Sequence, residues 1–434
     1  MRQEFLVAFL WVCLQAAAQT SWTMRQCMQY AVEHNHEVKQ AERELDSHHA
    51  AKTGAVGRFL PAVSASVGAQ YNFGRAIDPE TNTYTDVSTF YNGYSLQASL
   101  PVFDGFSRVH ALRAAKAGVL MGQSELRQKQ SQTALGVMQA FVNAVYCEEM
   151  VGMAAEKVQE TELLLRQTRL LEEVGRKSLA DVAQVESQKA EADYELTRQQ
   201  NLLASAMLEL KKSMAFPLGE ELTIKNEEWT AATPPAVGIP VGNSSFELQT
   251  AHHQMQVSLH EWHQARASLY PSLSMSVGLN TTYYHTLHSH TGQSFHTQLK
   301  NNMGEYIGAT LSIPLFNRMQ TMTTVRRARN NYLMARESFE QKQLEVEKLS
   351  REAWLDWQGY QKQARQMQEK VEADSIAYQL TRRQFEEGLS TAIDLRATSS
   401  QLLNSKATLL QCQLMVRVKE QLIRYYRGET IWTE

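Results

Sequence analysis

The stretch Val63-Ser64-Ala65-Ser66-Val67-Gly68-Ala69-Gln70-Tyr71-Asn72-Phe73 decides the fold, because apolar side chains alternate with polar side chains or glycine along its whole length. A period of two predicts a β-strand with one apolar face and one polar face. The polar face is uncharged and mostly small, which is typical of a transmembrane β-barrel around a water-filled lumen. We therefore expect this strand to face hydrocarbon on one side and water on the other.

Three further stretches repeat this pattern, so the strands come as two pairs, one in each half of the chain. Their apolar positions are Tyr94, Leu96, Ala98, Leu100 and Val102; Leu273, Met275, Val277 and Leu279; and Ile307, Ala309, Leu311, Ile313 and Leu315. Four strands alone leave open edges in lipid, where each unpaired backbone group costs several kcal/mol. Two to four copies of the chain would supply about 8 to 16 strands, and the pattern does not choose among these numbers. Two ordinary soluble hairpins are the alternative interpretation.

Composition limits the class of protein. The chain has 434 residues, a net charge of -3 and 21% charged residues, which argues against disorder and against a nucleic-acid partner. Beyond the start there is no run of eighteen apolar residues, so no membrane-spanning helix is expected. Arg2, the apolar segment 5–14 and three alanines at 16–18 predict an export signal at residues 1–18. Three later cysteines are too far apart for a disulfide framework or a zinc site, so we expect them to be packing residues: Cys27, Cys147 and Cys412.

Two long tracts, residues 102–216 and 315–434, contain no proline and are rich in good helix formers. Each has a glycine near its middle, Gly175 or Gly388, of the kind that ends a helix in a left-handed turn. The tracts are therefore predicted to be helical hairpins. Their outgoing helices, at about 107–174 and 319–387, would each be about 100 Å long and would need lateral partners along their length.

The start of each returning helix carries its own signal. Ser178 is followed by Asp181, and Thr391 by Asp394. Serine or threonine followed three residues later by an acidic residue predicts a capping box.

The chain is an internal duplication. Leu100-Pro101-Val102-Phe103-Asp104 is matched 213 positions later by Ile313-Pro314-Leu315-Phe316-Asn317. Each half is predicted to contain a helix, two strands and a long helical hairpin. We expect a first repeat at 19–216, a proline-rich linker or equatorial segment at 217–245 and a second repeat at 246–434.

This layout resembles the TolC-type outer-membrane efflux proteins over nearly the whole mature chain. The most specific motifs are the two strand exits quoted above and the tip sequence Phe385-Glu386-Glu387-Gly388-Leu389-Ser390-Thr391-Ala392-Ile393-Asp394-Leu395. The resemblance implies a mixed α/β membrane protein: a homotrimer with a 12-stranded barrel in outer-membrane lipid, continued by a periplasmic α-helical barrel. It also implies a periplasmic adaptor protein and an inner-membrane pump that dock at the helical tips.

The tips are the predicted regulated end of this conduit. Six tip residues are candidates for contact with the adaptor: Gly175, Arg176, Lys177, Gly388, Leu389 and Ser390. Turn chemistry is the alternative explanation of the glycines.

The resemblance also implies a periplasmic gate at Asp181, Phe385 and Asp394. Asp181 matches a family aspartate that bonds to an arginine, but Ser390 stands where the arginine would be, and Phe385 replaces a tyrosine. Asp394 matches an aspartate of the entrance ring, while Ala397 occupies the second such place. Arg176 or Lys177 is a possible substitute for the missing arginine, and helix capping is the alternative role of both aspartates.

Two groups of histidines have the composition of a metal site. The loop between the third and fourth strands contains His285, His288, His290 and His296. We expect this loop to be external and solvated, so these residues are only weak candidates for a metal site, and we expect no cofactor. His260-Glu261-Trp262-His263 is similar to a zinc-protease helix but is one residue short of the i, i+4 spacing. No nucleophile constellation or phosphate-binding loop is present, so we expect no enzyme.

The sequence thus favours a passive outer-membrane duct of a tripartite efflux or type I secretion system. A periplasmic structural coiled-coil protein without a pore is the alternative. A soluble monomer would favour that alternative, and a detergent-stable oligomer would favour the duct.

Overall fold

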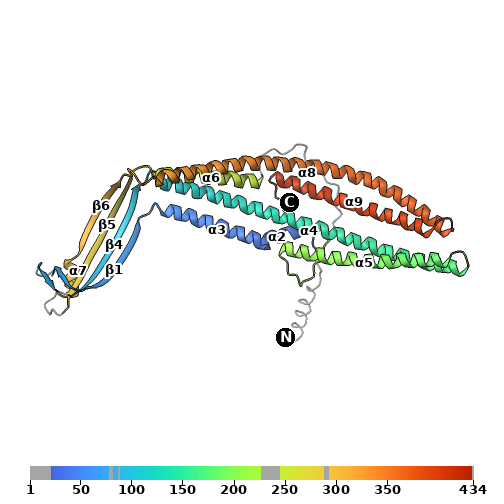
Figure 1. Ribbon diagram of the computed structural model, residues 1–434, viewed down its shortest axis with the longest axis horizontal. Coiled ribbons are helices and arrows are strands. Elements are labelled where there is room, and N and C mark those ends of the chain that lie inside the picture. Colours follow the sequence, from blue (N-terminus) through green and yellow to red (C-terminus); the bar gives the residue numbers. More distant parts are fainter. Residues whose placement is uncertain (1–20, 78–81, 87, 226–244, 288–292, 433–434) are drawn as a thin grey trace, which may run out of the picture. The chain divides into compact units, whose positions relative to one another are not determined.

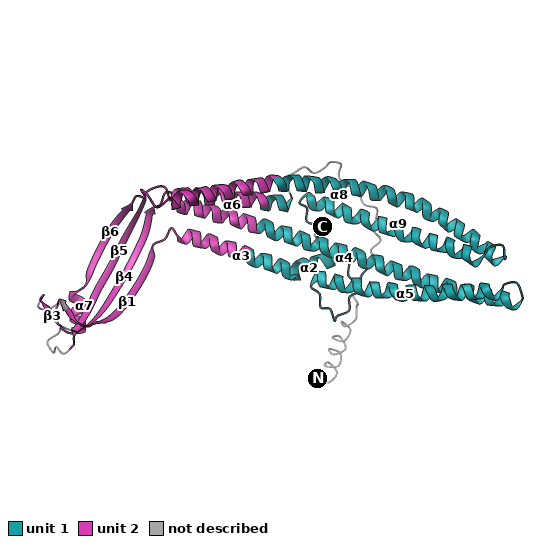
Figure 2. Ribbon diagram, in the orientation of Figure 1, with its two compact units in different colours: residues 1–44, 123–250, 341–434 teal, residues 45–122, 251–340 magenta. Residues whose placement is uncertain are grey.

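The computed structural model describes residues 21–77, 82–86, 88–225, 245–287 and 293–432. The predicted export signal, most of the predicted linker, and His288 and His290 lie outside the described residues. The chain divides into two compact units (Figure 2): unit 1 contains residues 1–44, 123–250 and 341–434, and unit 2 contains residues 45–122 and 251–340. Within the described part of the chain, no helix is long and apolar enough to cross a membrane.

Unit 2 contains one antiparallel four-stranded sheet, in the order β1-β4-β5-β6 (Figure 1). The strands are β1 (Ala62–Asn72), β4 (Thr89–Phe103), β5 (Ser272–Thr286) and β6 (Gly304–Ser312). The four predicted strands are therefore confirmed. β4 and β5 are longer than the alternating stretches, and β6 ends before Ile313 and Leu315, which we expected to belong to it.

The register of the sheet keeps apolar residues opposite apolar residues across all four strands. One row consists of Val63, Ala98, Val277 and Ile307, and the next row consists of Ser64, Gln97, Gly278 and Tyr306. A shift of one residue in any strand would exchange the faces. The pairing therefore produces one apolar and one polar face, as the sequence predicts.

Loop elements at one end of the sheet are not predicted by the sequence pattern. A short hairpin, β2 (Arg75–Ile77) with β3 (Tyr84–Asp86), lies between β1 and β4. Helix α7 (Phe295–Asn301) lies between β5 and β6. The buried side-chain amide of Gln298 accepts a hydrogen bond from the N–H of Tyr284 (3.0 Å) and donates one to its carbonyl oxygen (3.0 Å). Gln298 therefore supplies backbone hydrogen bonds to the part of β5 that extends beyond its pairing with β6.

Two long helical hairpins follow the strands. α4 (Ser107–Glu173) and α5 (Leu179–Met214) form the first, and α8 (Gln320–Glu386) and α9 (Ala392–Tyr426) form the second. Both outgoing helices have 67 residues, or about 100 Å at 1.5 Å per residue. The predicted helical hairpins and their bounds are confirmed to within two residues.

Three shorter helices complete the repeats: α2 (Met24–His34) and α3 (His36–Gly57) in the first, and α6 (Phe246–Ala267) in the second. The first part of the predicted linker forms backbone hydrogen bonds with Trp22, which precedes α2. Trp22 donates its N–H to the Thr223 carbonyl oxygen (2.8 Å), and its own carbonyl accepts from Lys225 (2.9 Å). This part of the linker is thus more ordered than its four prolines suggest.

The interior of unit 1 includes side chains on one face of α4 together with residues of the other helices. Val137, Phe141 and Val145 recur at four-residue steps and are each 1% exposed or less. Cys27, Cys147 and Cys412 are free and buried, as expected for packing residues.

Candidate functional site

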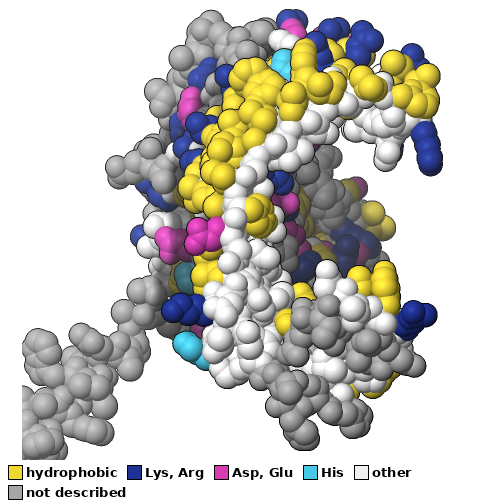
Figure 3. Space-filling model, turned by 90° about the vertical axis from the view of Figure 1, so that its left-hand side faces the viewer, with side chains coloured by type: hydrophobic (Ala, Val, Ile, Leu, Met, Phe, Trp, Pro, Cys, Tyr) yellow, Lys and Arg dark blue, Asp and Glu magenta, His cyan; other side chains and the backbone are white. Residues whose placement is uncertain are grey.

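The first part of the site is the sheet. Its apolar face is exposed: Val67 on edge strand β1 keeps 69% of its surface accessible, and Ile307 on the opposite edge strand β6 keeps 75%. Figure 3 shows hydrophobic side chains gathered in a band along the upper part of the curved surface. On the other face the hydroxyls of Ser66 and Ser95 bond to each other at 2.7 Å. An exposed apolar face of this size indicates contact with lipid.

Each long helix begins at a turn that is the same in both repeats. Asp104 accepts a hydrogen bond from the N–H of Arg108 (3.1 Å), and Asn317 accepts from that of Thr321 (3.3 Å). The two residues that directly follow each of these side chains have positive φ: Gly105 and Phe106 in the first repeat, and Arg318 and Met319 in the second. The duplication seen in the sequence therefore extends to the backbone conformation.

The second part of the site is the pair of helical tips, which share one turn. Gly175 and Gly388 have φ of +75° and +80°. The N–H of Arg176 bonds to the Leu171 carbonyl oxygen, and that of Leu389 bonds to Gln384, both at 2.8 Å. These bonds close a helix end at which the glycine adopts the left-handed conformation. Turn geometry therefore accounts for both glycines.

Exposed apolar side chains surround these turns. Val174 and Leu179 flank the first tip, Leu389 and Ile393 lie in the second, and each is at least 66% exposed. Of these four residues, only Leu389 is a candidate predicted from the sequence. Val174 and Leu179 could have been found as apolar residues directly beside a predicted glycine turn. Arg176 is exposed at the same turn, and Ser390 and Lys177 are half-buried.

Asp181 and Asp394 are both engaged in the capping boxes that the sequence predicts. The Asp181 carboxylate accepts from the N–H (3.0 Å) and hydroxyl (2.8 Å) of Ser178, and Asp394 accepts in the same way from Thr391 (3.1 and 2.6 Å). These hydrogen bonds lower the pKa of both carboxyls: the Ser178 N–H has the largest effect on the pKa of Asp181, and the Thr391 hydroxyl on that of Asp394. Within one chain, both aspartates stabilise the first turns of α5 and α9.

Phe385, the third predicted gate residue, is 1% exposed and lies in a small core with Leu164, Val185, Ala392 and Leu395. This core joins the end of the first helical hairpin to the end of the second. Lys177 Nζ lies 3.9 Å from the centroid of the Phe385 ring, a cation–π contact. Of the two basic residues considered as substitutes for the missing arginine, Lys177 is the one that reaches the second hairpin in this way.

Polar contacts between α5 and α9 continue this connection. Gln188 Nε2 donates to the carbonyl oxygen of Ala392 at 3.1 Å. Arg396 forms an ion pair with Glu191 at 2.8 Å. Gln188, Glu191 and Arg396 could not be predicted from the sequence, because only the packing of α5 against α9 brings these residues together.

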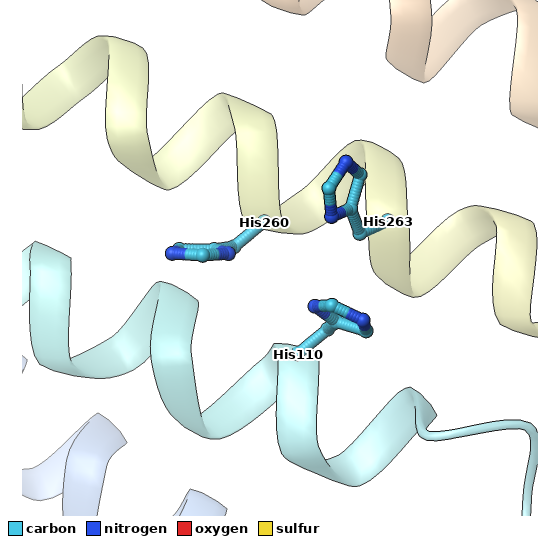
Figure 4. A group of neighbouring side chains, drawn as sticks. All are labelled: His110, His260 and His263. Atoms are coloured by element: carbon cyan, nitrogen blue, oxygen red, sulfur yellow. The ribbon is translucent and has the colours of Figure 1, made fainter.

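A group of three histidines lies in unit 2 and was not predicted as a site. His110 is on α4, and His260 and His263 are on α6 (Figure 4). One nitrogen from each of the three rings lies within 4.8 Å of the other two. His260 and His263 belong to the motif that is one residue short of the zinc-protease spacing. The sequence gives no sign of a metal site there, because the third ring, His110, comes from another helix. The candidates His285 and His296 do not belong to this group.

Comparison with known proteins identifies the class. The sequence model of the family described as outer membrane efflux protein matches residues 27–215 and 242–428. The chain belongs to the outer membrane efflux protein family. It is therefore an outer-membrane channel protein with a helical extension in the periplasm, and not an enzyme.

Individual relatives agree with this assignment. The chain is 24% identical to the alkaline protease secretion protein AprF of Pseudomonas aeruginosa, over 86% of this chain and 78% of that protein. It is 22% identical to the probable efflux pump outer membrane protein TtgC of Pseudomonas putida, over 60% of this chain and 56% of that protein. The solved structure of CusC matches with a TM-score of 0.82 at 15% identity, over 95% of this chain and 93% of that one. The TolC-type fold inferred from the sequence is confirmed.

Proposed function

We propose that three copies of this chain form the passive exit duct of a tripartite efflux or type I secretion system. The observation that carries the proposal is the sheet. The register of its strands produces one apolar and one polar face, and the outer edges of β1 and β6 pair with no other described strand. Unpaired strand edges in lipid cost several kcal/mol per backbone group. Sister chains would remove this cost by pairing β6 of one copy with β1 of the next.

The polar face of the closed sheet would hold water, and the apolar face would contact lipid. Four strands per chain in a trimer give the 12-stranded barrel that the family resemblance implies. AprF is named for protease secretion and TtgC for efflux, which supports export of polypeptides or small molecules as the function of this chain.

The experiment that tests the assembly uses the full chain extracted from outer membranes in detergent. Native mass spectrometry is expected to show three copies, and planar bilayers are expected to show ion conductance. A monomer that dissolves without detergent and does not conduct would contradict the proposal and favour a periplasmic coiled-coil protein.

We propose that the periplasmic adaptor and the inner-membrane pump engage the tips. The candidate contacts are Gly175, Arg176, Lys177, Gly388, Leu389 and Ser390, to which the exposed Val174, Leu179 and Ile393 are added. Exposed apolar side chains beside a rigid turn are suited to docking, because they lose contact with water on binding. Site-specific photocrosslinkers at Val174 and Leu389 should capture the adaptor, and the same crosslinker at exposed Leu208, on α5, should not.

We propose that the gate is the connection between the two tips. The Lys177–Phe385 contact, the Gln188–Ala392 hydrogen bond and the Arg396–Glu191 ion pair would hold the hairpins together in the closed state. An adaptor with higher affinity for the separated hairpins would shift the population to the open state. Asp181 and Asp394 would contribute by keeping the first turns of α5 and α9 formed.

A further inference from the structure

The three histidines of unit 2 are positioned by strand pairing. α4 begins at Ser107, directly after β4, and α6 ends at Ala267, directly before β5. β4 and β5 pair along their whole lengths, from Thr89 opposite Thr286 to Phe103 opposite Leu273. His110 in the first turns of α4 and the two histidines in the last turns of α6 are therefore held next to each other by the strands from which their helices extend.

The three rings are close enough to share one ion. Their centroids lie 5.0 Å apart for His110 and His263, 6.2 Å for His110 and His260, and 6.4 Å for His260 and His263. Imidazole nitrogens bind zinc at about 2.0–2.1 Å. The present separations of up to 4.8 Å therefore need only side-chain rotation to converge on one ion, and all three side chains are half-buried rather than packed in a core.

Two of the three rings, His110 and His260, are affected by burial. Burial is the largest cause that lowers the pKa of His110 and of His260, and Arg113 lowers both further. Neutral imidazole is the form that binds a metal, because one ring nitrogen then has a free lone pair. The buried Nδ1 atoms of His110 and His260 also have no hydrogen-bond partner among the described residues.

Solvent reaches the group through an open cavity of about 340 Å³. His110 and His263 line it, together with Phe103, Phe106 and the positively charged Arg266. An ion could enter by this path, and a water molecule could complete its coordination.

We propose that His110, His260 and His263 bind one late first-row transition metal ion, Cu²⁺ or Zn²⁺, in each chain. Imidazole is a ligand of choice for these ions, whereas Mg²⁺ and Ca²⁺ need oxygen ligands. Among the described residues the group contains no carboxylate. Arg113 and Arg266 oppose any cation bound by charge alone, so affinity must come from the nitrogen–metal bonds. The bound ion would connect α4 of the first repeat to α6 of the second.

The test measures metal binding by the full chain, purified in detergent with a tag that contains no histidine. After treatment with a chelator, the protein is titrated with Cu²⁺ and Zn²⁺ at pH 7.5, and with Mg²⁺ for comparison. We expect His110→Ala and His263→Ala to bind Cu²⁺ or Zn²⁺ at this site more than about tenfold more weakly than the original chain. At metal concentrations that fill the site in the original chain, each variant should therefore bind one ion fewer per chain. Mg²⁺ should not bind at this site.

Two matched controls separate this group from other histidines. His252→Ala combined with His253→Ala removes two histidines from the same helix and should leave the site filled. Alanine at His285, His288, His290 and His296 tests the loop. If the loop variant loses all stoichiometric metal while His110→Ala binds like the original chain, the proposal is overturned.

A measurement without substitutions covers the case in which a variant fails to fold. Diethylpyrocarbonate modifies accessible imidazoles, and mass spectrometry identifies the modified residues. Zn²⁺ should protect His110, His260 and His263 by at least severalfold while leaving His252 reactive. Equal modification of the three residues with and without Zn²⁺ would overturn the proposal.

Discussion

The ammonium group of Lys177 lies over the ring of Phe385 at 3.9 Å and so connects the turn of the first helical hairpin to the end of α8 in the second. Phe385 is fixed in its core by Leu164, Val185, Ala392 and Leu395. The contact therefore joins a half-buried lysine to a buried ring. In the proposed closed state, it is one of three contacts that would have to break before the hairpins separate.

Replacing Lys177 tests this role. A cation–π contact at a partly exposed site is worth about 0.5–1 kcal/mol, so Lys177→Gln should increase the open population about two- to fivefold per chain. Lys177→Arg keeps the cation and should change it little. Closed-state conductance in planar bilayers is the measurement, with Lys212→Gln, whose lysine pairs with Glu209 on the same helix, as the control. Unchanged conductance in Lys177→Gln would exclude the contact from the gate.

The two strand exits offer a comparison between glycine and arginine at the same turn. A Cβ on Gly105, where φ is +66°, would lie 2.5 Å from the Ala267 carbonyl oxygen. Gly105→Ala should therefore destabilise the fold by more than about 1 kcal/mol. Arg318 has φ of +56° but already carries a side chain, so Arg318→Gly should change stability by no more than about 1 kcal/mol. Thermal unfolding in detergent checks both, and equal losses would contradict this account.

The tips are expected to loosen in acid. Hydrogen bonds from Ser178 and Thr391 lower the pKa of Asp181 and Asp394 below the ordinary value of 3.8. A lowered folded-state pKa means that the stabilisation is complete above the unfolded value and is lost as the pH falls through the folded one. Hydrogen exchange of the tip amides should therefore accelerate below about pH 4, relative to the same amides in Asp181→Asn and Asp394→Asn. An identical pH profile in the variants would contradict the capping role.

The three buried thiols should be unreactive in the native protein. Burial raises the pKa of Cys27 to about 12 and also raises the pKa of Cys147 and Cys412. The thiolate is the reactive form, so maleimide at pH 7.5 should label all three only after denaturation. Mass spectrometry of labelled peptides is the measurement. Rapid native labelling of Cys27 would show that α2 opens away from its packing.

Local sequence patterns predicted most of the fold. Alternation identified β1, and the glycines at 175 and 388 and the Ser178–Asp181 and Thr391–Asp394 pairs located the tips to within two residues. These features are set by neighbours in the sequence. The extension of β5 to Thr286 could not be predicted in this way, because Gln298 of α7 satisfies its backbone.

The candidate site shows the same division. The tip residues were found because turn chemistry is local, whereas the Arg396–Glu191 pair and the union of His110 with His263 join residues separated by more than 150 positions. Such neighbours are decided by the packing of α5 on α9 and by the pairing of β4 with β5. A single sequence gives no local signal for either.

The outer strands β1 and β6, each of which has one edge that pairs with no other described strand, also bear on how the protein reaches the membrane. A lone copy would expose the hydrogen-bonding groups of two strand edges to hydrocarbon, so insertion before subunit association is strongly unfavourable. On the proposed assembly, membrane entry and oligomerisation are a single cooperative event. Mass action then makes the yield of finished ducts depend steeply on the amount of exported chain. Modest underproduction would leave unassembled precursors in the periplasm rather than a proportionally smaller number of pores.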